Sequence, residues 1–341
     1  MANPSLSHEL KANRSQQIMN CGSNFTTPLA SVILPAYNAS ATIAETIQSV
    51  LAQDFEDFEL IVINDGSTDE TDNLIRSFSD HRIVYQNRSH HGLVNTLNHG
   101  IATSRGKFIL RIDADDVAYR KRFSKQIAYL EQNPSVGILG TQAVAIDMSG
   151  EQIGIGRKPL GWQAVINYSR FACPVLHPTY CVRREVFIKL NGYRDLPSED
   201  YDFLLRALEM GVQIENLPEP LIKYRVSGEG ISSGNPEKME IATRLLQKMH
   251  RNRLLGEDEQ PTLDRLLALE RKTSPWFRRV IGLRNRLIEE SKRRNGLRGI
   301  LVECEIAAIS LLHPAVLRSS YRLYQARKYL PREPINLDGD E

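Results

Sequence analysis

The stretch FILRIDADDVAYR, residues Phe108–Arg120, joins an apolar run directly to a cluster of acids. The apolar half predicts a buried β-strand. Three carboxylates follow it within four positions, at Asp113, Asp115 and Asp116. Like charges this close repel one another and raise one another's pKa values. Either a bound divalent cation relieves the repulsion, or one of the acids simply caps a following helix; the stretch alone leaves both interpretations open.

Three similar units precede this stretch, each an apolar strand followed by helical spacing. The strands are expected at residues 31–34, 58–63 and 82–86, and the helices at 41–53, 68–78 and 93–103. Together with a fourth strand at 107–112 they predict an α/β fold, with a parallel, doubly wound sheet and helices on both faces. Ligands of such sheets bind at the carboxyl ends of the strands, where three polar loops converge, at 35–38, 64–67 and 113–116.

The second half of the chain has a mixed pattern that ends in helices. Short strands are expected at 136–139, 143–147, 178–182 and 221–226, with a helix at 200–210. Helical spacing then predominates at 238–255, 263–272, 277–293, 299–312 and 316–330. We expect a flexible lead-in over 1–29, an α/β domain over 30–234 that binds the substrate, and a basic helical region over 235–341.

Composition is that of a soluble globular protein, with an uneven distribution of charge. The 341 residues are 41% hydrophobic and 25% charged, with a net charge of +2. Residues 271–332 contain 15 lysines and arginines but 4 acids, so the rest of the chain is acidic. Four scattered cysteines predict reduced thiols, neither a disulfide framework nor a zinc site. No apolar leader or long uncharged apolar run is present, so we expect no secretory signal and no membrane-spanning helix.

Further polar residues each allow two interpretations. Asp65 can bind a nucleobase or ribose, or can form an Asx-turn around Gly66. The acids of Ser198–Asp202 can supply a general base, or can cap the helix that they open. His177 is either structural or functional, and Arg225 pairs with a phosphate or with a surface acid. The tandem histidines at 90 and 91 read as solvent-facing or as minor substrate contacts.

Six motifs in a fixed order resemble one enzyme family. They are VILPAYN, VINDGSTD, RIDADD, a His-Pro pair, NGY and SEDYDFLLR, at residues 32–38, 62–69, 111–116, 177–178, 191–193 and 198–206. In this order they resemble the inverting nucleotide-sugar glycosyltransferases of family 2, which have the GT-A fold. That fold is a Rossmann-like, mostly parallel sheet with helices on both faces. The helical C-terminal third lies outside the resemblance. No G-x-G-x-x-G follows the first strand, which weighs against a dinucleotide-dependent oxidoreductase.

The resemblance implies a site and a reaction. Asp200 would be the base that deprotonates the acceptor, with Glu199 beside it, and Asp115 would bind Mn²⁺ or Mg²⁺ on the diphosphate of the sugar donor. The family pattern further implies a set of nucleotide-sugar-binding residues: Pro35, Ala36, Tyr37, Asn38, Asp65, Arg111, Asp113, Asp116, His177 and Arg225. The donor would be a nucleotide-diphosphate sugar, a UDP-sugar above all. The acceptor would be a hydroxyl of a glycan or lipid-linked sugar in cell-surface polysaccharide or glycolipid synthesis.

The sequence departs from the family pattern at two positions. Relatives often have a histidine shortly after the Tyr-Arg of the last core strand, where Ser227 stands in this chain. Asn64 stands where many relatives have a further aspartate. The first departure affects how the diphosphate of the donor would be bound, and the second affects which nucleobase would be preferred.

The basic segment 271–332 allows an additional partner. Its mixture of cationic and apolar residues suits a helix on an anionic bilayer, so we expect a cytoplasmic protein that associates with the inner face of the plasma membrane. A packed, solvated helical subdomain is the alternative. Two other function classes are a nucleotide-sugar sensor without catalysis and a nucleic-acid binder. Asp115 and Asp200 argue against the sensor, and no nucleic-acid partner is expected because the acidic loops would repel phosphates.

Overall fold

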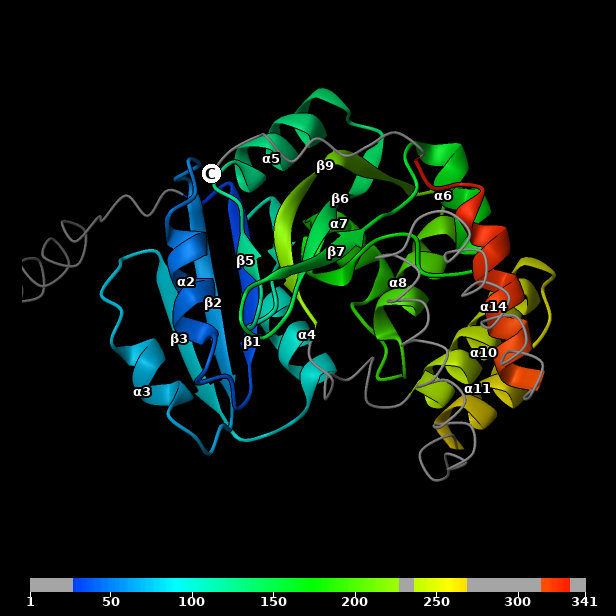
Figure 1. The fold of residues 1–341 in the computed structure, drawn as a ribbon, viewed down its shortest axis with the longest axis horizontal. Coiled ribbons are helices and arrows are strands. Elements are labelled where there is room, and N and C mark those ends of the chain that lie inside the picture. Colours follow the sequence, from blue (N-terminus) through cyan, green and yellow to red (C-terminus); the bar gives the residue numbers. More distant parts are fainter. Residues whose placement is uncertain (1–26, 227–235, 269–313, 332–341) are drawn as a thin grey trace, which may run out of the picture.

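The computed structural model describes residues 27–226, 236–268 and 314–331, and its centre is one mixed sheet (Figure 1). Within those residues the sheet has nine strands in the order β3-β2-β1-β4-β8-β6-β9-β5, and β7 pairs with β6 beside this path. The strands are β1 (Ala30–Ala36), β2 (Phe58–Asp65), β3 (Ile83–Arg88), β4 (Phe108–Arg111), β5 (Val117–Ala118), β6 (Val136–Ile146), β7 (Gln152–Gly156), β8 (Cys181–Arg183) and β9 (Gln213–Arg225).

The first four strands form the parallel half of the sheet. β1 pairs in parallel with β2 and β4, and β2 pairs in parallel with β3. Helices α2 (Ile43–Leu51), α3 (Thr71–Arg76) and α4 (Leu93–Thr103) connect them. The three predicted strand–helix units and the fourth strand are thus confirmed, and the carboxyl ends of β1, β2 and β4 lie at one edge.

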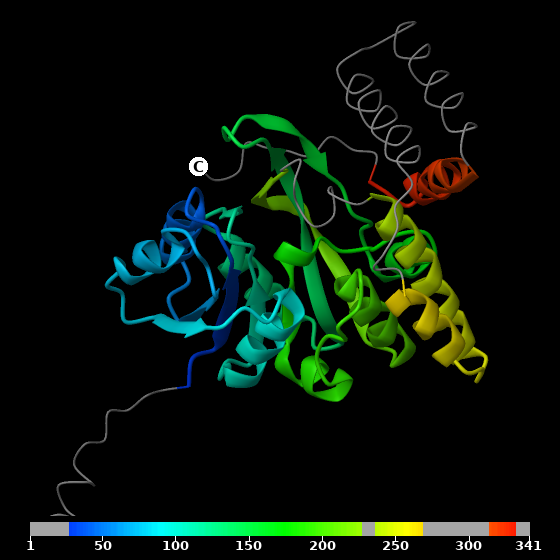
Figure 2. The same cartoon turned by 90° about the horizontal axis from the view of Figure 1, so that it is seen from below.

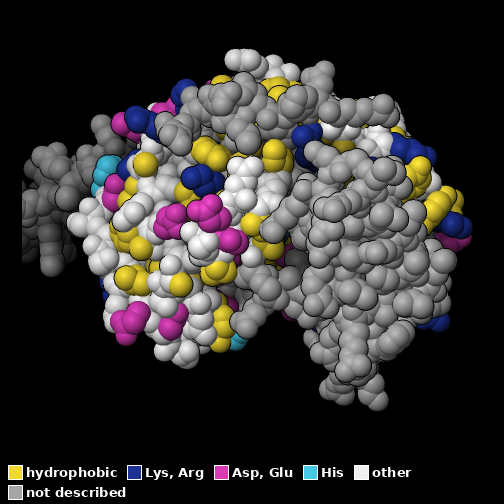
Figure 3. Space-filling view, in the orientation of Figure 1, with side chains coloured by type: hydrophobic (Ala, Val, Ile, Leu, Met, Phe, Trp, Pro, Cys, Tyr) yellow, Lys and Arg dark blue, Asp and Glu magenta, His cyan; other side chains and the backbone are white. Residues whose placement is uncertain are grey.

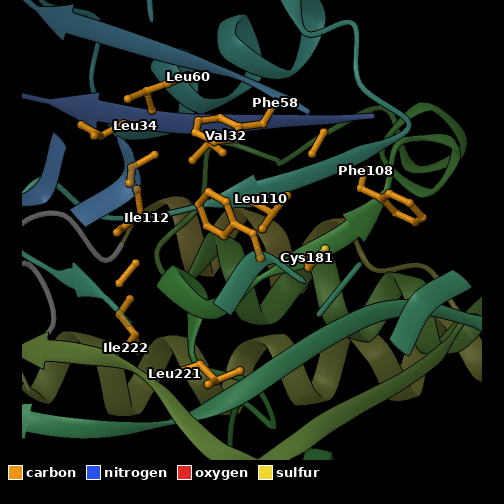
Figure 4. Packing of buried hydrophobic residues seen from close by; sticks show 14 of the residues in the cluster. Val32, Leu34, Phe58, Leu60, Phe108, Leu110, Ile112, Cys181, Leu221 and Ile222 are labelled. Carbon is orange, nitrogen blue, oxygen red and sulfur yellow. The ribbon is translucent and has the colours of Figure 1, made fainter. Parts of the chain in front are cut away.

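Alternate side chains of these strands enter two separate cores. Val32 and Leu34 of β1 pack on the face covered by α2, α3 and α5 (Arg122–Gln132). Ile33 packs on the opposite face with α4, α6 (Trp162–Ser169), α7 (Arg184–Leu190) and α8 (Glu199–Glu209). Figure 4 shows Val32, Leu34, Leu60 and Leu110 side by side in the first core. Burial on both faces explains why these strands are continuous apolar runs without alternation.

The second half of the sheet differs from the expected strands. The two strands predicted at 136–139 and 143–147 are one strand, β6, whose pairing with β9 shifts register around Gly140. A Cβ at Gly140 would lie 2.2 Å from a methyl carbon of Val175, so a close approach requires this glycine in mid-strand. β9 begins at Gln213, eight residues before the predicted start. The first half of β9 was not predicted because Pro218 and Pro220 interrupt the strand pattern. The register shift between β6 and β9 accommodates both prolines.

Several short elements were not predicted. They are β5, β7, α5, α6 and α7. The strand predicted at 178–182 is the 3₁₀ turn η1 (His177–Thr179) followed by β8, because Pro178 favours the start of a helical turn. β8 runs antiparallel to both β4 and β6, and this antiparallel pairing makes the sheet mixed.

Helices of the C-terminal region pack together beside α8. α10 (Pro236–Leu254), α11 (Gln260–Leu267) and α14 (Pro314–Arg327) lie on one side of the molecule in both views (Figures 1 and 2). Leu205 of α8, Leu246 and Met249 of α10 and Leu266 of α11 form a core that these three helices share. α10 and α14 agree closely with the prediction, whereas α11 starts and ends earlier than expected. The helices predicted at 277–293 and 299–312 and the lead-in up to residue 26 lie outside the described residues.

None of the described helices combines the length and the apolar composition that a transmembrane span requires.

Candidate active site

The acidic turn, residues Asp113–Asp116, lies between β4 and β5 at the carboxyl edge of the parallel strands. One carboxylate oxygen from each of Asp113, Asp115 and Asp116 lies within 4.8 Å of the other two. The hydroxyls of Thr42 and Thr46, at the start of α2, donate to the carbonyl oxygen of Ala114 at 2.9 and 3.0 Å. α2 therefore fixes the backbone of the turn that brings the three acids together.

Burial places the acidic turn under electrostatic stress. Burial, followed by the charge of Asp113, raises the pKa of Asp115 to about 6. Burial, with the charges of Asp113 and Asp115, raises the pKa of Asp116 well above its usual range. Oδ1 of Asp116 accepts the backbone N–H of Arg225 at 2.9 Å, but its buried Oδ2 has no partner. Three hard oxygen ligands with one unsatisfied atom fit a divalent cation such as Mn²⁺ or Mg²⁺.

Arg225 forms hydrogen bonds with the acidic turn through its backbone and its side chain. Its Nε donates to the carbonyl oxygen of Asp115 at 2.9 Å, and its Nη1 donates to the carbonyl oxygens of Asp147 and Met148. Nη2 lies 2.7 Å from a carboxylate oxygen of Glu45. The contacts of this predicted phosphate-binding residue are thus with the protein. In Figure 3 acidic side chains gather beside a basic one near the position of β5, the strand that follows the turn.

Arg111 links the acidic turn to the second acidic cluster. The side chain of Arg111 is buried and forms an ion pair with Asp113, with Nη1 3.1 Å from Oδ2. Its charge also acts on Glu199, at the start of α8, and on His177. Residues separated by almost 90 positions therefore share one electrostatic environment.

The loops after β1 and β2 form a second group at the same edge. Asn38 has a φ of 47°, in the left-handed region that asparagine tolerates. Its Oδ1 accepts the backbone N–H of Thr68 at 2.8 Å, and its own N–H donates to Ser67 Oγ at 3.0 Å. Pro35 and Ala36 are the buried last residues of β1, and the half-exposed ring of Tyr37 follows. The centroid of the Tyr37 ring lies 4.2 Å from that of His90.

Asp65 organises the loop before α4. Its two carboxylate oxygens accept the backbone N–H groups of His91 and Gly92, each at 2.9 Å, and its Oδ2 is 3.0 Å from Nδ1 of His90. The predicted turn around Gly66 exists, but Asn64 forms its hydrogen bond, by accepting the N–H of Ser67 at 3.1 Å. Asp65 is therefore not the residue of the Asx-turn, and it fixes His90 beside Tyr37.

Glu199 and Asp200 lie in the first turn of α8, and the charge of Asp113 in the acidic turn acts on Glu199. Burial, followed by the charge of Asp200, raises the pKa of Glu199 to about 7. The thiol of Cys173 lies 3.4 Å from Oδ2 of Asp200 and can donate to it. Nδ1 of His177 lies 3.5 Å from Oε1 of Glu199, and Nε2 lies 3.0 Å from the hydroxyl oxygen of Tyr193. The environments of the two acids differ, which is how a fold assigns different roles to paired carboxyls.

Sequence reasoning missed three side chains of this arrangement. The sequence predicts no more than a minor contact for His90, and the NGY motif contains Tyr193 without indicating a role for it. Cys173 is 27 positions from Asp200, and no spacing rule indicates their contact. Cys173 and Cys181 are free thiols, as predicted for them. Ser227, at the first departure from the family pattern, lies outside the described residues.

Comparison with known proteins decides the family. The model of glycosyl transferase family 2 matches residues 31–190. An uncharacterised glycosyltransferase of Haemophilus influenzae is 36% identical over 233 residues, which are 64% of this chain and 72% of the relative. The chain belongs to glycosyl transferase family 2. It is an enzyme of the glycosyltransferase class, as the motif order predicted. Asp200 lies beyond the part that the family model matches.

Other relatives of this family 2 glycosyltransferase have more specific names. The β-1,3-glucosyltransferase WfaP of Escherichia coli, which is named for UDP-Glc and α-D-GlcNAc-diphosphoundecaprenol, is 24% identical over 65% of this chain and 86% of its own length. The structure of S. aureus TarS with UDP-GlcNAc matches 92% of this chain and 98% of its own, with a TM-score of 0.55 and 18% identity. The mannosyltransferase PcManGT of Pyrobaculum calidifontis, in complex with GDP-Man and Mn²⁺, matches 94% and 93%, with a TM-score of 0.52 and 18% identity. These structures support the GT-A fold.

We call the hydrogen bonds from the Arg225 side chain to the carbonyl oxygens of Asp115, Asp147 and Met148 the clamp, and they lead to a prediction about stability. We expect Arg225→Met to lower the free energy of unfolding by about 3 kcal/mol, because it leaves buried carbonyl oxygens of the acidic turn without donors. Urea denaturation at neutral pH measures this change. The matched control is Arg76→Met: the Arg76 side chain is 54% exposed, against 4% for Arg225, and its loss should leave stability close to wild type. Equal effects of the two substitutions would contradict the clamp.

Proposed function

We propose that this glycosyltransferase moves a sugar from a UDP-sugar to a hydroxyl of a glycan or lipid-linked sugar, with a divalent cation and with inversion at the anomeric carbon. The observation that carries the proposal is the position of Arg111, which forms an ion pair with Asp113 of the acidic turn and acts by its charge on Glu199, the neighbour of Asp200. A site for a charged diphosphate thus adjoins a carboxylate that can take a proton. The names of WfaP and of the TarS complex support a UDP-sugar, and WfaP supports a lipid-linked acceptor.

The nucleoside half of the sugar donor belongs, in this proposal, at the ends of β1 and β2. The nucleobase would bind against the residues at the end of β1, which are Pro35, Ala36, Tyr37 and Asn38. The half-exposed ring of Tyr37 offers a stacking surface for it. Asp65 supports this place through His90 and has further lone pairs for a base or ribose. Asp113 would face the ribose, with Arg111 holding its carboxylate.

The diphosphate half belongs at the acidic turn. Asp115 would hold the cation, with Asp116 behind it, and the Mn²⁺ in the PcManGT complex supports this assignment. When bound, the cation would neutralise charge on the leaving diphosphate. Arg225 keeps the turn in place and contacts the protein, so we assign it to positioning.

Asp200 acts as the general base in the proposed reaction. The acceptor hydroxyl attacks the anomeric carbon from the face opposite the diphosphate, and its proton passes to a carboxylate oxygen of Asp200. One new glycosidic bond forms as the bond to the diphosphate oxygen breaks, so the configuration inverts. Burial raises the pKa of Glu199 to about 7, so we assign the role of the base to Asp200, the other acid of the pair.

The domain assignment and the location are also proposals. Residues 30–234 would form the catalytic domain, and 235–341 a helical region whose basic segment 271–332 meets an anionic membrane surface at the inner face of the plasma membrane. The lipid-linked acceptor in the name of WfaP supports such a location.

The membrane proposal is tested by flotation of the full chain. We expect it to float with vesicles that contain anionic lipid at low salt, and to be released at high salt because ions screen the attraction. Vesicles of neutral lipid are the control. Equal binding to both kinds of vesicle, or to neither, would contradict the proposal.

The cation site predicts a loss of sugar-donor affinity. We expect Asp115→Ala to weaken UDP binding in Mn²⁺ by about 10-fold or more, and to abolish the difference between binding with and without Mn²⁺. Isothermal titration calorimetry measures both quantities. Asp54→Ala, at an exposed position before β2, is the control and should bind as wild type. Unchanged Mn²⁺-dependent binding in Asp115→Ala would refute the site.

The base predicts a loss of turnover without loss of binding. We expect Asp200→Asn to reduce kcat by about 10²–10⁴-fold, since the amide cannot accept the proton, while UDP binding in Mn²⁺ is retained. Nucleotide release from a panel of UDP- and GDP-sugars, with glycan and lipid-linked acceptors, is the measurement. The exposed Asp195→Asn is the control. Near-normal turnover in Asp200→Asn would exclude Asp200 as the base, and binding without release in wild type would favour a sensor.

A further inference from the structure

His177 lies between two side chains that each bring an oxygen atom to one of its ring nitrogens. Its Nδ1 faces Oε1 of Glu199 at 3.5 Å, and its Nε2 faces the hydroxyl oxygen of Tyr193 at 3.0 Å. The rings of Tyr180 and Tyr193 pack against the imidazole, with centroids at 4.8 and 5.2 Å. Both ring nitrogens therefore meet protein groups, and one of these groups is the neighbour of the proposed base.

The imidazole of His177 stays neutral in this place. Burial, followed by the positive charge of Arg111, holds the pKa of His177 well below its usual range. A neutral imidazole has one N–H and one lone pair, so it can donate on one side and accept on the other. Which nitrogen donates must then depend on the protonation of Glu199.

Two arrangements of the chain Glu199–His177–Tyr193 satisfy this condition. With Glu199 protonated, its O–H donates to Nδ1, and Nε2–H donates to the oxygen of Tyr193. With Glu199 ionised, Nδ1–H donates to the carboxylate, and the O–H of Tyr193 donates to Nε2. The net difference is one proton released to solvent, while the ring keeps one proton and no charge.

The surroundings of Glu199 allow both arrangements near neutral pH. The groups that act on Glu199 are the carboxyl groups of Asp200 on α8 and Asp113 in the acidic turn, the guanidinium of Arg111 on β4 and the neutral imidazole of His177 in η1. Burial outweighs the arginine, so the pKa of Glu199 is raised to about 7. Glu199 is thus neutral below this pH and ionised above it.

We propose that His177 is a positioning residue, which together with Tyr193 holds Glu199 beside Asp200 in either protonation state by exchanging its tautomer. The inference rests on the proposed function in taking Asp200 as the base. Ionisation of Glu199 places a second negative charge beside Asp200, and this charge favours transfer of the acceptor's proton to the acid pair. The rate of transfer then rises as the pH passes through the range in which Glu199 ionises.

The tautomer exchange is tested without any assay of transfer. Nitrogen-15 NMR of histidine-labelled protein distinguishes the two neutral tautomers from the charged ring. We expect His177 to remain neutral from pH 6 to 8 and to change from the Nε2–H to the Nδ1–H tautomer across this range. Glu199→Gln should hold it in one tautomer throughout. A charged ring in this range, or a tautomer change that survives Glu199→Gln, overturns the proposal.

Kinetics separate positioning from contact with the sugar donor. With Mn²⁺ and whichever of UDP-glucose, UDP-N-acetylglucosamine and GDP-mannose turns over, we expect His177→Asn to reduce kcat by about 10–100-fold with KM for the donor unchanged. The rise of kcat near pH 7 should be absent in Glu199→Gln. Tyr193→Phe removes the hydroxyl that bonds to Nε2 of His177. We expect this variant to remain folded and its rise of kcat to occur at a different pH.

The matched control is His250→Gln. His250 faces another acid of the same helix, with Nδ1 2.6 Å from Oε1 of Glu209, at the end of α8 remote from the site. We expect kcat and its pH profile to be unchanged in this variant. A raised KM with unchanged kcat in His177→Asn would make His177 a ligand of the donor and overturn the proposal. Absence of transfer by wild type would refute the proposed function, while the NMR result still decides the tautomer exchange.

Discussion

The site depends on buried arginines that make an acidic turn tolerable before any ligand arrives. Arg111 pairs with Asp113, and Arg225 binds the backbone on the other side of the turn. Arg122 lies deeper and is fully buried. It donates to the carbonyl oxygens of Arg111 and Pro178, both at 2.7 Å. Burial lowers the pKa of Arg122 to about 10, so it remains positive at neutral pH and adds to the field on the acids.

The same arginines fix the distance between the two halves of the site. Arg122 contacts the last residue of β4 and the residue after His177 through a single guanidinium group. The acidic turn follows β4, and His177 contacts Glu199 at the start of α8. Chain segments far apart in sequence are thus joined by short, buried, charge-assisted hydrogen bonds. A site that must align a diphosphate with an acceptor hydroxyl needs this rigidity, because misplacement of the order of 1 Å reduces rates strongly.

The sequence predicted the parts of the molecule that local patterns determine. The continuous apolar runs of β1, β2 and β4 identified strands buried on both faces, and the polar residues at their ends identified the edge that carries the site. β6 and β9 were predicted less well, because Gly140 and the two prolines of β9 serve tertiary fitting and interrupt the strand pattern. Contacts such as Cys173 with Asp200, or His177 with Tyr193, depend on how η1 and α8 meet. No periodicity records such contacts, and the family resemblance indicated Asp200 and His177 but not the side chains that bond to them.

Helix α8 connects the site to the C-terminal helices. Its first turn contains Glu199 and Asp200, whereas Glu209 at its end pairs with His250 and Arg253 of α10. Between them, the fully buried Asp202 forms ion pairs with Arg194 and Arg206. Arg194 also reaches Glu259, just before α11. α8 is thus ion-paired with α10 and, through Arg194, with the segment before α11. The C-terminal helices, although outside the family motifs, are therefore packed on the helix whose first turn contains the proposed base.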